Sequence, residues 1–195
     1  MQRLKEKLLV FRVSEGKDHG AFEQLYELYF ERIQRFVYFK VSVKEEAEDL
    51  TSQVFLKTWE YLTDDQAKRV QNFKAFIYKL TRNLVVDYYR RQGRAPETVS
   101  LEDQGEELEN IPDYRQSFLL TQLYKSDQAY LSDCLKRMKD EYREVLVLRF
   151  LEQMDNDEIA KIMEKSPGNI RVLIHRAIKV LREIYDQRER SHPTT

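Results

Sequence analysis

Apolar side chains recur at the three- and four-residue spacing of an α-helix through the first half of this chain. One such run spans residues 21–39, and Asp18 stands just before it as a predicted N-cap. The same spacing predicts further helices over residues 43–59 and 73–91, with a polar loop over residues 63–72 between them. The sequence holds only five Gly and four Pro among 195 residues, so few helix breakers are available. The predicted fold class is therefore all-α.

An acidic stretch without helical periodicity separates the two halves of the chain. The pattern breaks at residues 94–96, and seven carboxylates with no basic residue follow between Pro96 and Asp113. A segment of this composition cannot bury enough apolar surface to fold alone. We therefore predict two small helical domains, an N-terminal helical bundle and a C-terminal helix-turn-helix domain, joined by an acidic flexible linker. The predicted ranges are 1–94, 95–117 for the linker, and 118–195.

Positive charge is concentrated in two segments, although the formal net charge is only −1. Residues 67–94 hold eight Lys and Arg against Asp87 alone, and residues 161–182 hold six against Glu164 alone. Nucleic-acid binding depends on local basic surface, because phosphate charge is neutralised locally. Two basic helical segments, one in each predicted domain, favour a nucleic-acid ligand over ordinary solvated helix faces.

The second domain contains the pattern of a helix-turn-helix. Residues 157–163 predict a short helix and residues 164–166 a turn, after which Ser166 would cap a helix that begins near Pro167. The cap of the first helix is predicted among Asp155, Asn156 and Asp157. The apolar seam between the two helices is predicted from Ile159, Ala160, Met163, Ile170 and Ile174. A second helix of this kind can enter the major groove of DNA and meet base edges.

The sequence contains no recognisable catalytic or metal-binding constellation. Cys134 is the only cysteine, and the histidines His19, His175 and His192 are scattered. Nucleotide-binding, nucleophile-elbow and zinc-protease motifs are absent from the sequence, so we predict that the chain is not an enzyme and uses no metal or cofactor. No run of eighteen apolar residues and no signal-peptide core occur, which predicts a cytoplasmic protein without membrane insertion.

Four stretches of the second domain are similar to one family of proteins. They are Asp140-Glu-Tyr-Arg-Glu-Val-Leu-Val-Leu-Arg-Phe-Leu151, Asp157-Glu-Ile-Ala160, Ser166-Pro-Gly-Asn-Ile-Arg171 and His175-Arg-Ala177. Together they resemble the C-terminal domain of extracytoplasmic-function (ECF) sigma factors of bacterial RNA polymerase, which reads the −35 promoter element. The resemblance implies −35 DNA contacts from Arg149, Asn169, Arg171, Val172, His175 and Arg176.

The first domain resembles the same family at two places. Residues 47–59 resemble the helix that docks on the clamp of the polymerase, and residues 73–84 with 87–91 resemble the −10 recognition and melting segment. The implied core-polymerase contacts come from Asp49, Leu50, Gln53, Val54 and Lys57. The implied −10 DNA contacts come from Lys68, Arg69, Asn72, Lys74, Tyr78, Arg82, Asn83, Arg90 and Arg91.

Helical spacing is consistent with the implied polymerase and −10 DNA contacts. Asp49, Gln53 and Lys57 share one helical face, and Leu50 and Val54 are predicted to form an apolar patch beside them, as in a protein interface. Aromatic side chains of the −10 segment, such as Tyr78 and Tyr88, could stack on unpaired bases. Trp59 is predicted to be a core residue.

The resemblance implies core RNA polymerase, promoter DNA and an anti-sigma factor as partners, and a monomer within the holoenzyme. The family usually has Ser and Arg where this chain has Val172 and Leu173, so one −35 contact is predicted to be missing. Two other functions remain open. One is a stand-alone helix-turn-helix regulator that binds duplex DNA as a dimer, and the other is an adaptor that binds polymerase without reading DNA.

Overall fold

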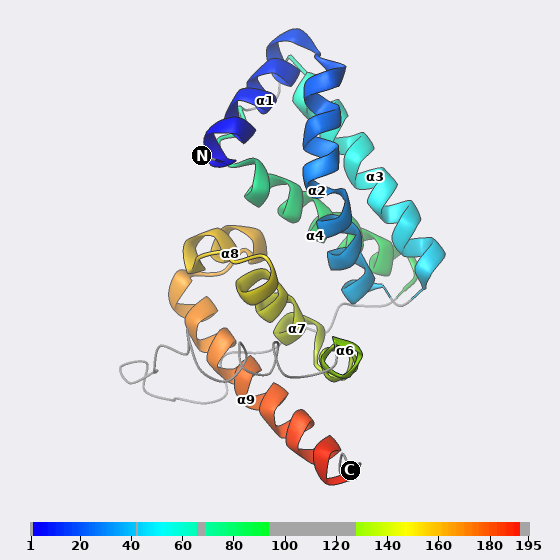
Figure 1. Cartoon of the computed structure of the whole chain (residues 1–195), viewed down its shortest axis with the longest axis vertical. Coiled ribbons are helices and arrows are strands. Elements are labelled where there is room, and N and C mark those ends of the chain that lie inside the picture. The colour runs from blue at the N-terminus through cyan, green and yellow to red at the C-terminus, as the bar shows by residue number, and fades with distance from the viewer. Residues whose placement is uncertain (1, 42, 66–68, 94–127, 192–195) are drawn as a thin grey trace. The chain divides into compact units, whose positions relative to one another are not determined.

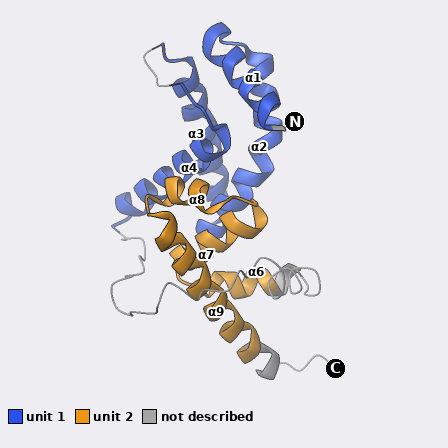
Figure 2. Ribbon diagram, turned by 90° about the vertical axis from the view of Figure 1, so that its left-hand side faces the viewer, with its two compact units in different colours: residues 1–95 blue, residues 96–195 orange. Residues whose placement is uncertain are grey.

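The computed structural model describes residues 2–41, 43–65, 69–93 and 128–191. Every regular element in these ranges is a helix, which confirms the all-α class (Figure 1). The chain divides into two compact units, residues 1–95 and 96–195, coloured separately in Figure 2. The predicted linker, residues 95–117, lies outside the described residues. Among the described helices, none combines the length and apolar character that crossing a bilayer requires.

The first unit is built from α1 (Gln2–Gly16), α2 (His19–Lys40), α3 (Lys44–Thr63) and α4 (Phe73–Arg91). Asp18 caps α2 as predicted, because its Oδ1 accepts a hydrogen bond of 3.0 Å from the backbone N–H of Ala21. That N–H and the guanidinium of Arg12, 2.7 Å from Oδ2, lower the pKa of the Asp18 carboxyl. Asn72 caps α4 in the same way through the N–H of Ala75, also at 3.0 Å.

The sequence pattern did not predict α1, because its apolar residues point to more than one side of the helix. Leu9, Val10 and Val13 are buried where α1 packs against the other helices of the unit. Leu4 and Leu8 are exposed on the same helix. No single apolar stripe therefore stands out in the sequence.

The core of the first unit lies where α2, α3 and α4 meet. Its largest fully buried side chains are Leu25, Tyr29, Ile33, Phe36, Ile77 and Tyr78. The rings of Phe36 and Tyr78 pack edge to face with centroids 5.2 Å apart, and those of Tyr29 and Phe73 do the same at 5.2 Å. Trp59 is half-buried and stacks on His19, so α3 is held to the start of α2.

The second unit contains α6 (Gln128–Lys136), α7 (Asp140–Leu146), a π-helical turn η2 (Val147–Leu151), α8 (Asn156–Met163) and α9 (Pro167–Ser191). Of the three predicted candidates, Asp155 is the N-cap of α8. It forms a capping box with Glu158, with hydrogen bonds of 2.8 and 3.2 Å between side chain and backbone. Ser166 caps α9 as predicted, since its Oγ accepts a 3.2 Å hydrogen bond from the N–H of Asn169.

The seam between α8 and α9 is formed mainly by the residues predicted for it. Ile159, Ala160, Met163 and Ile170 are all buried. The prediction of Ile174 is wrong, because Ile174 is only half-buried and Leu173 is fully buried in its place. Ile170, Leu173 and Ala177 are all fully buried, so the buried line of α9 follows positions i, i+3 and i+7 and leaves Ile174 at its edge.

Candidate nucleic-acid and partner surfaces

One face of α3 combines exposed polar residues with one exposed apolar residue. Asp49, Gln53 and Lys57 are exposed, as an interface role requires. Leu50 and Val54, predicted to form an apolar patch beside them, are 5% and 0% exposed and belong to the core. That part of the prediction is wrong, because residues 50 and 54 lie on the inward side of the helix.

The apolar residue on this outward face is Leu56, which is 59% exposed. It lies three residues after Gln53 and seven after Asp49, so the helical period places it on their side of α3. Helical spacing alone could have identified it, once the inward face was assigned to Leu50 and Val54. The α3 face is defined here as Asp49, Gln53, Leu56 and Lys57.

Two described residues of the loop between α3 and α4 bind neighbouring helices. Arg69 pairs with Glu15 of α1 at 3.0 Å, and Asn72 caps α4. Lys68 lies outside the described residues. The side chain of Asn72 is therefore engaged with the backbone of α4 in this structure, while Arg69 stays largely exposed.

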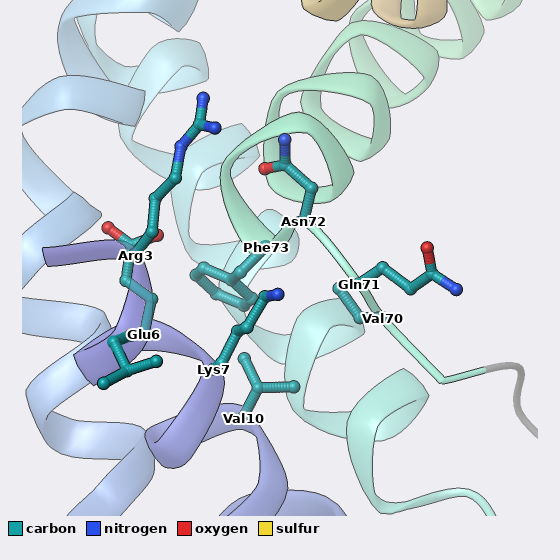
Figure 3. A pocket seen from close by; sticks show the side chains of 9 residues that line it. Arg3, Glu6, Lys7, Val10, Val70, Gln71, Asn72 and Phe73 are labelled. Carbon is teal, nitrogen blue, oxygen red and sulfur yellow. The ribbon is translucent and has the colours of Figure 1, made fainter. Parts of the chain in front are cut away.

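A cavity of about 360 Å³ opens between α1 and this loop. The side chains that line it come from α1 and from the loop and include one carboxylate: Arg3, Leu4, Glu6, Lys7 and Val10 of α1, and Val70, Gln71 and Asn72 of the loop (Figure 3). The ring of Phe73 forms an apolar part of its wall. Arg3 and Lys7 were not among the predicted site residues, because their helix was not predicted from the sequence.

The outward face of α4 is basic. Asn83 and Arg90 are exposed and lie on one line of the helix with the half-buried Lys79, at positions i, i+4 and i+11. Arg90 also pairs with Asp87 at 3.1 Å. The other predicted cations stand elsewhere on α4: Lys74 and Arg82 are half-buried and Arg91 is exposed in the last turn.

The aromatic residues of α4 do not form an exposed stacking surface. Tyr78 is fully buried against Phe36, so its predicted contact with DNA bases is wrong for this structure. Tyr88 donates a hydrogen bond from its hydroxyl to Glu46 of α3 and accepts one of 2.7 Å from Gln92. Burial, and then the hydrogen bond to the Glu46 carboxylate, raise the pKa of Tyr88 to about 12. Tyr88 thus fixes the end of α4 against α3.

The helix-turn-helix is braced by residues that the sequence did not single out. Glu164, which ends α8, adopts a left-handed conformation with φ of 56°. Lys165 follows it and pairs with Glu141 of α7 at 2.9 Å. The side chain of Glu141 is only 6% exposed, so this ion pair ties the turn to the interior of the unit.

The first turns of α9 present the predicted −35 residues in a defined order. Asn169 and Arg171 are exposed, and Val172, His175 and Arg176 are half-buried. At 3.6 residues per turn, Arg171 and Arg176 lie about 140° apart around the axis. Val172 and His175 fall between them, on the side opposite the buried Ile170 and Leu173. The outward side of α9 therefore has a central strip with a cation on each flank.

Two predictions about this unit change in the light of the structure. Arg149 is half-buried and donates a 2.7 Å hydrogen bond to the carbonyl oxygen of Met154, so it holds the chain that leads into α8. Leu173 was predicted to mark a missing DNA contact, yet it is fully buried. The side chain at this position contributes to packing. Among the described residues, no group of three or more His, Cys, Asp and Glu could hold a metal ion.

Comparison with protein families assigns each unit. The model described as "Sigma-70 region 2" matches residues 25–95, and the model described as "Sigma-70, region 4" matches residues 128–181. The two matches together cover more than half of the chain and fall in different units. Regions 2 and 4 in this order define a transcription initiation factor of the sigma-70 class, a class of proteins that are not enzymes.

Similar proteins place the chain more narrowly within that class. It is 30% identical over 174 residues to the ECF RNA polymerase sigma factor BldN of Streptomyces coelicolor, covering 89% of this chain and 63% of BldN. It is 23% identical over 166 residues to the ECF RNA polymerase sigma factor SigM of Bacillus subtilis, covering 85% of this chain and 95% of SigM. The chain belongs to the extracytoplasmic-function sigma factors of bacterial RNA polymerase.

Two solved structures share its fold. CnrH, in complex with the cytosolic domain of CnrY, has a TM-score of 0.64 and 19% identity, over 94% of this chain and 98% of CnrH. The sigma factor RpoE of Bartonella quintana, in complex with the anti-sigma factor NepR, has a TM-score of 0.62 and 21% identity. That match covers 85% of this chain and 96% of RpoE.

Proposed function

We propose that this sigma factor binds core RNA polymerase, directs it to promoters, and helps to open the DNA at the −10 element. The observation that carries the proposal is that one chain contains both a unit that matches region 2 and a unit that matches region 4. Each of these units has its own basic helix. The proposed domains are residues 1–94 and 118–195, with residues 95–117 as the linker. As a partner of polymerase, the protein would act in the cytoplasm and as a monomer within the holoenzyme.

The second unit would read the −35 element through α9. Its central strip, Val172 and His175, would face base edges in the major groove, where a His ring can hydrogen-bond and a Val methyl can contact the thymine methyl. Arg171 and Arg176, on the two flanks, would meet the phosphates on either side of the groove. Asn169, which is exposed at the N-terminus of the helix, would contact a phosphate or a base edge.

The first unit would hold the opened −10 strand. Asn83 and Arg90 on the outward line of α4 supply polar and cationic contacts for a single strand. The cavity between α1 and the loop has room for one unpaired nucleotide. The cations Arg3 and Lys7 would meet its phosphate, and they outnumber the one carboxylate in the wall, that of Glu6. Lys68, Arg69, Lys74, Arg82 and Arg91 would add to the electrostatic attraction.

The α3 face would bind the polymerase. Exposed polar residues around one exposed apolar residue match the composition of a protein interface with a small apolar centre. Leu56 would be that centre, with Asp49, Gln53 and Lys57 around it. We further propose that an anti-sigma factor binds the chain, since RpoE, which shares its fold, is seen with the anti-sigma factor NepR.

Run-off transcription tests the proposal. Purified core polymerase should produce transcripts from a mapped promoter only when the chain is added, and the chain should co-purify with core polymerase. Replacing Arg171 and Arg176 with Ala should lower initiation at every promoter while core binding persists, which excludes an adaptor that does not contact DNA. A chain that binds palindromic duplex DNA tightly as a dimer, and fails to bind core polymerase, would be a stand-alone regulator.

A further inference from the structure

The outward side of α1 carries a stripe of exposed apolar side chains. Leu4, Leu8 and Phe11 are 77%, 59% and 56% exposed. Spacings of four and then three residues place them on one line along the helix, opposite the fully buried Val13. A helix packed on a domain by one face usually presents polar residues on the other. An apolar stripe in that position marks a surface that another molecule covers.

Basic residues flank the stripe near its N-terminal half. The helical period places Lys5 along one edge and Lys7 along the other, and both side chains are exposed. Arg12 lies on the same edge as Lys5, but it pairs with Asp18 at 2.7 Å. The charge that a partner would meet beside Leu4 and Leu8 is therefore positive.

We propose that the α1 stripe, made of Leu4, Leu8 and Phe11 with Lys5 and Lys7 at its edges, is a docking site for an acidic amphipathic helix of a partner protein. The stripe extends from residue 4 to residue 11, about 10 Å at 1.5 Å per residue, which matches two turns of a partner helix. Apolar residues of that helix at i, i+4 and i+7 cover the stripe, and its flanking Asp or Glu face the lysines.

Charge disfavours two other occupants of the α1 stripe, a second copy of this chain and an anionic membrane. In a second copy packed stripe to stripe, Lys5 and Lys7 of both chains would face one another. An anionic bilayer would attract these lysines but would also meet Glu15, which continues the line of the stripe one turn beyond Phe11. The carboxylate of Glu15 pairs with Arg69 at 3.0 Å, and inserting Phe11 into lipid would desolvate this ion pair.

A peptide selection tests the proposal on the full-length chain. A library of helical peptides displayed on phage is selected for binding, and the strongest binder is synthesised with a fluorescent label. We expect the selected peptides to carry apolar residues at i, i+4 and i+7 with flanking Asp or Glu. Leu8→Glu and Phe11→Glu should each weaken binding about tenfold or more by fluorescence anisotropy. Lys5→Glu should weaken the acidic peptide and strengthen a version of it with Lys in place of Glu.

The matched control is Val43→Glu, an exposed apolar position outside the α1 stripe. Val43→Glu changes another exposed apolar residue of the same unit, 47% exposed at the N-cap position of α3, and should bind the peptide like the parent chain. Circular dichroism verifies that each variant is folded. Selected peptides that are basic, or that bind Leu8→Glu as well as the parent, overturn the proposal. So does stripe-dependent binding to phosphatidylglycerol vesicles without any acidic peptide, or a dimer that Leu8→Glu dissociates.

Discussion

The Nζ atom of Lys165 lies 2.9 Å from Oε1 of Glu141, and this contact joins the turn of the helix-turn-helix to the first turn of α7. The Glu141 side chain is 6% exposed and that of Lys165 is 22% exposed. A carboxylate so nearly buried depends on its partner, because removing the partner leaves a desolvated charge. The position of the turn, and with it the start of α9, is therefore coupled to α7.

Lys165→Met should destabilise the second unit. It keeps most of the apolar stem of the side chain but removes the charge, so the carboxylate of Glu141 loses a partner at a cost of about 1–3 kcal/mol. Hydrogen exchange of α8 and α9 amides should accelerate accordingly. Combining it with Glu141→Gln gives a double-mutant cycle. Additive effects of the two changes would show that the contact contributes nothing to stability.

Tyr88 should make the first unit sensitive to alkaline pH. Its pKa is raised from 10.0 to about 12 in the folded chain, so the neutral phenol is favoured by folding. The resulting stabilisation is complete below pH 10 and is lost as the pH rises through 12, where the folded protein also loses this proton.

Tyr88→Phe removes that pH-dependent contribution. The difference in unfolding free energy between parent and Tyr88→Phe should therefore shrink between pH 10 and pH 12, measured by urea unfolding. A constant difference across this range would mean that Tyr88 titrates normally.

Local sequence signals predicted the helix ends better than the faces of the helices. Asp18 and Ser166 act through the backbone a few residues away, so their roles follow from nearby sequence alone. Whether Leu50 and Val54 point inward depends on which helices surround α3, which periodicity does not specify. For the same reason Tyr78 could be taken for a stacking platform, although it is buried against Phe36 of a distant segment.

The helix α1, which apolar periodicity did not predict, contributes to two of the proposed binding sites. In α1 the apolar residues occupy the packed side and part of the exposed side, so no polar face marks its orientation. The cavity and the α1 stripe both require this helix, and neither could be predicted from the sequence. The braces Glu141–Lys165 and Tyr88–Glu46 join residues too far apart in the chain for any spacing rule.

Leu56→Glu should weaken binding to core polymerase by about tenfold to a hundredfold, as expected for a central apolar contact of an interface. The residue is 59% exposed, so the change should leave the unfolding midpoint of the chain nearly unaltered. Fluorescence-detected titration with core polymerase measures the affinity. Val43→Glu, another exposed apolar position, serves as the control. Equal affinities of the Leu56→Glu variant and the parent would remove Leu56 from the interface.

Substitutions of the two flanking arginines of α9 should affect DNA binding differently from substitution of the central His175. Arg171→Ala and Arg176→Ala should weaken holoenzyme binding at all promoters alike, and each should reduce the slope of log K against log salt by about 1. His175→Ala should instead relax the preference at one base pair of the −35 element, with a loss of discrimination of about 1–3 kcal/mol. Binding to a set of single-base promoter variants at several salt concentrations distinguishes these patterns. A reversed outcome, with specificity lost in an Arg variant, would place that arginine on a base edge.

The cavity between α1 and the α3–α4 loop should matter only when DNA is unpaired. Arg3 and Lys7 stand on its α1 side, and a duplex cannot place a base in a space of about 360 Å³. The double variant Arg3→Ala, Lys7→Ala should therefore lower the occupancy of open complexes while leaving closed-complex formation nearly unchanged. Losing two phosphate contacts should also flatten the salt dependence of the opening step.

Permanganate reactivity of unpaired thymines measures opening, and a gel shift on duplex promoter measures closed-complex binding. A template with a pre-melted −10 region bypasses opening, but it still requires capture of the strand. The double variant should therefore remain defective on that template, because capture of the unpaired nucleotide is the step that these cations serve. Lys44→Ala removes an exposed cation of the same unit that pairs with Glu48 and lies outside this cavity. It should match the parent in both assays. Full rescue of the double variant by the pre-melted template would instead assign Arg3 and Lys7 to strand separation, and would leave the cavity without a nucleotide.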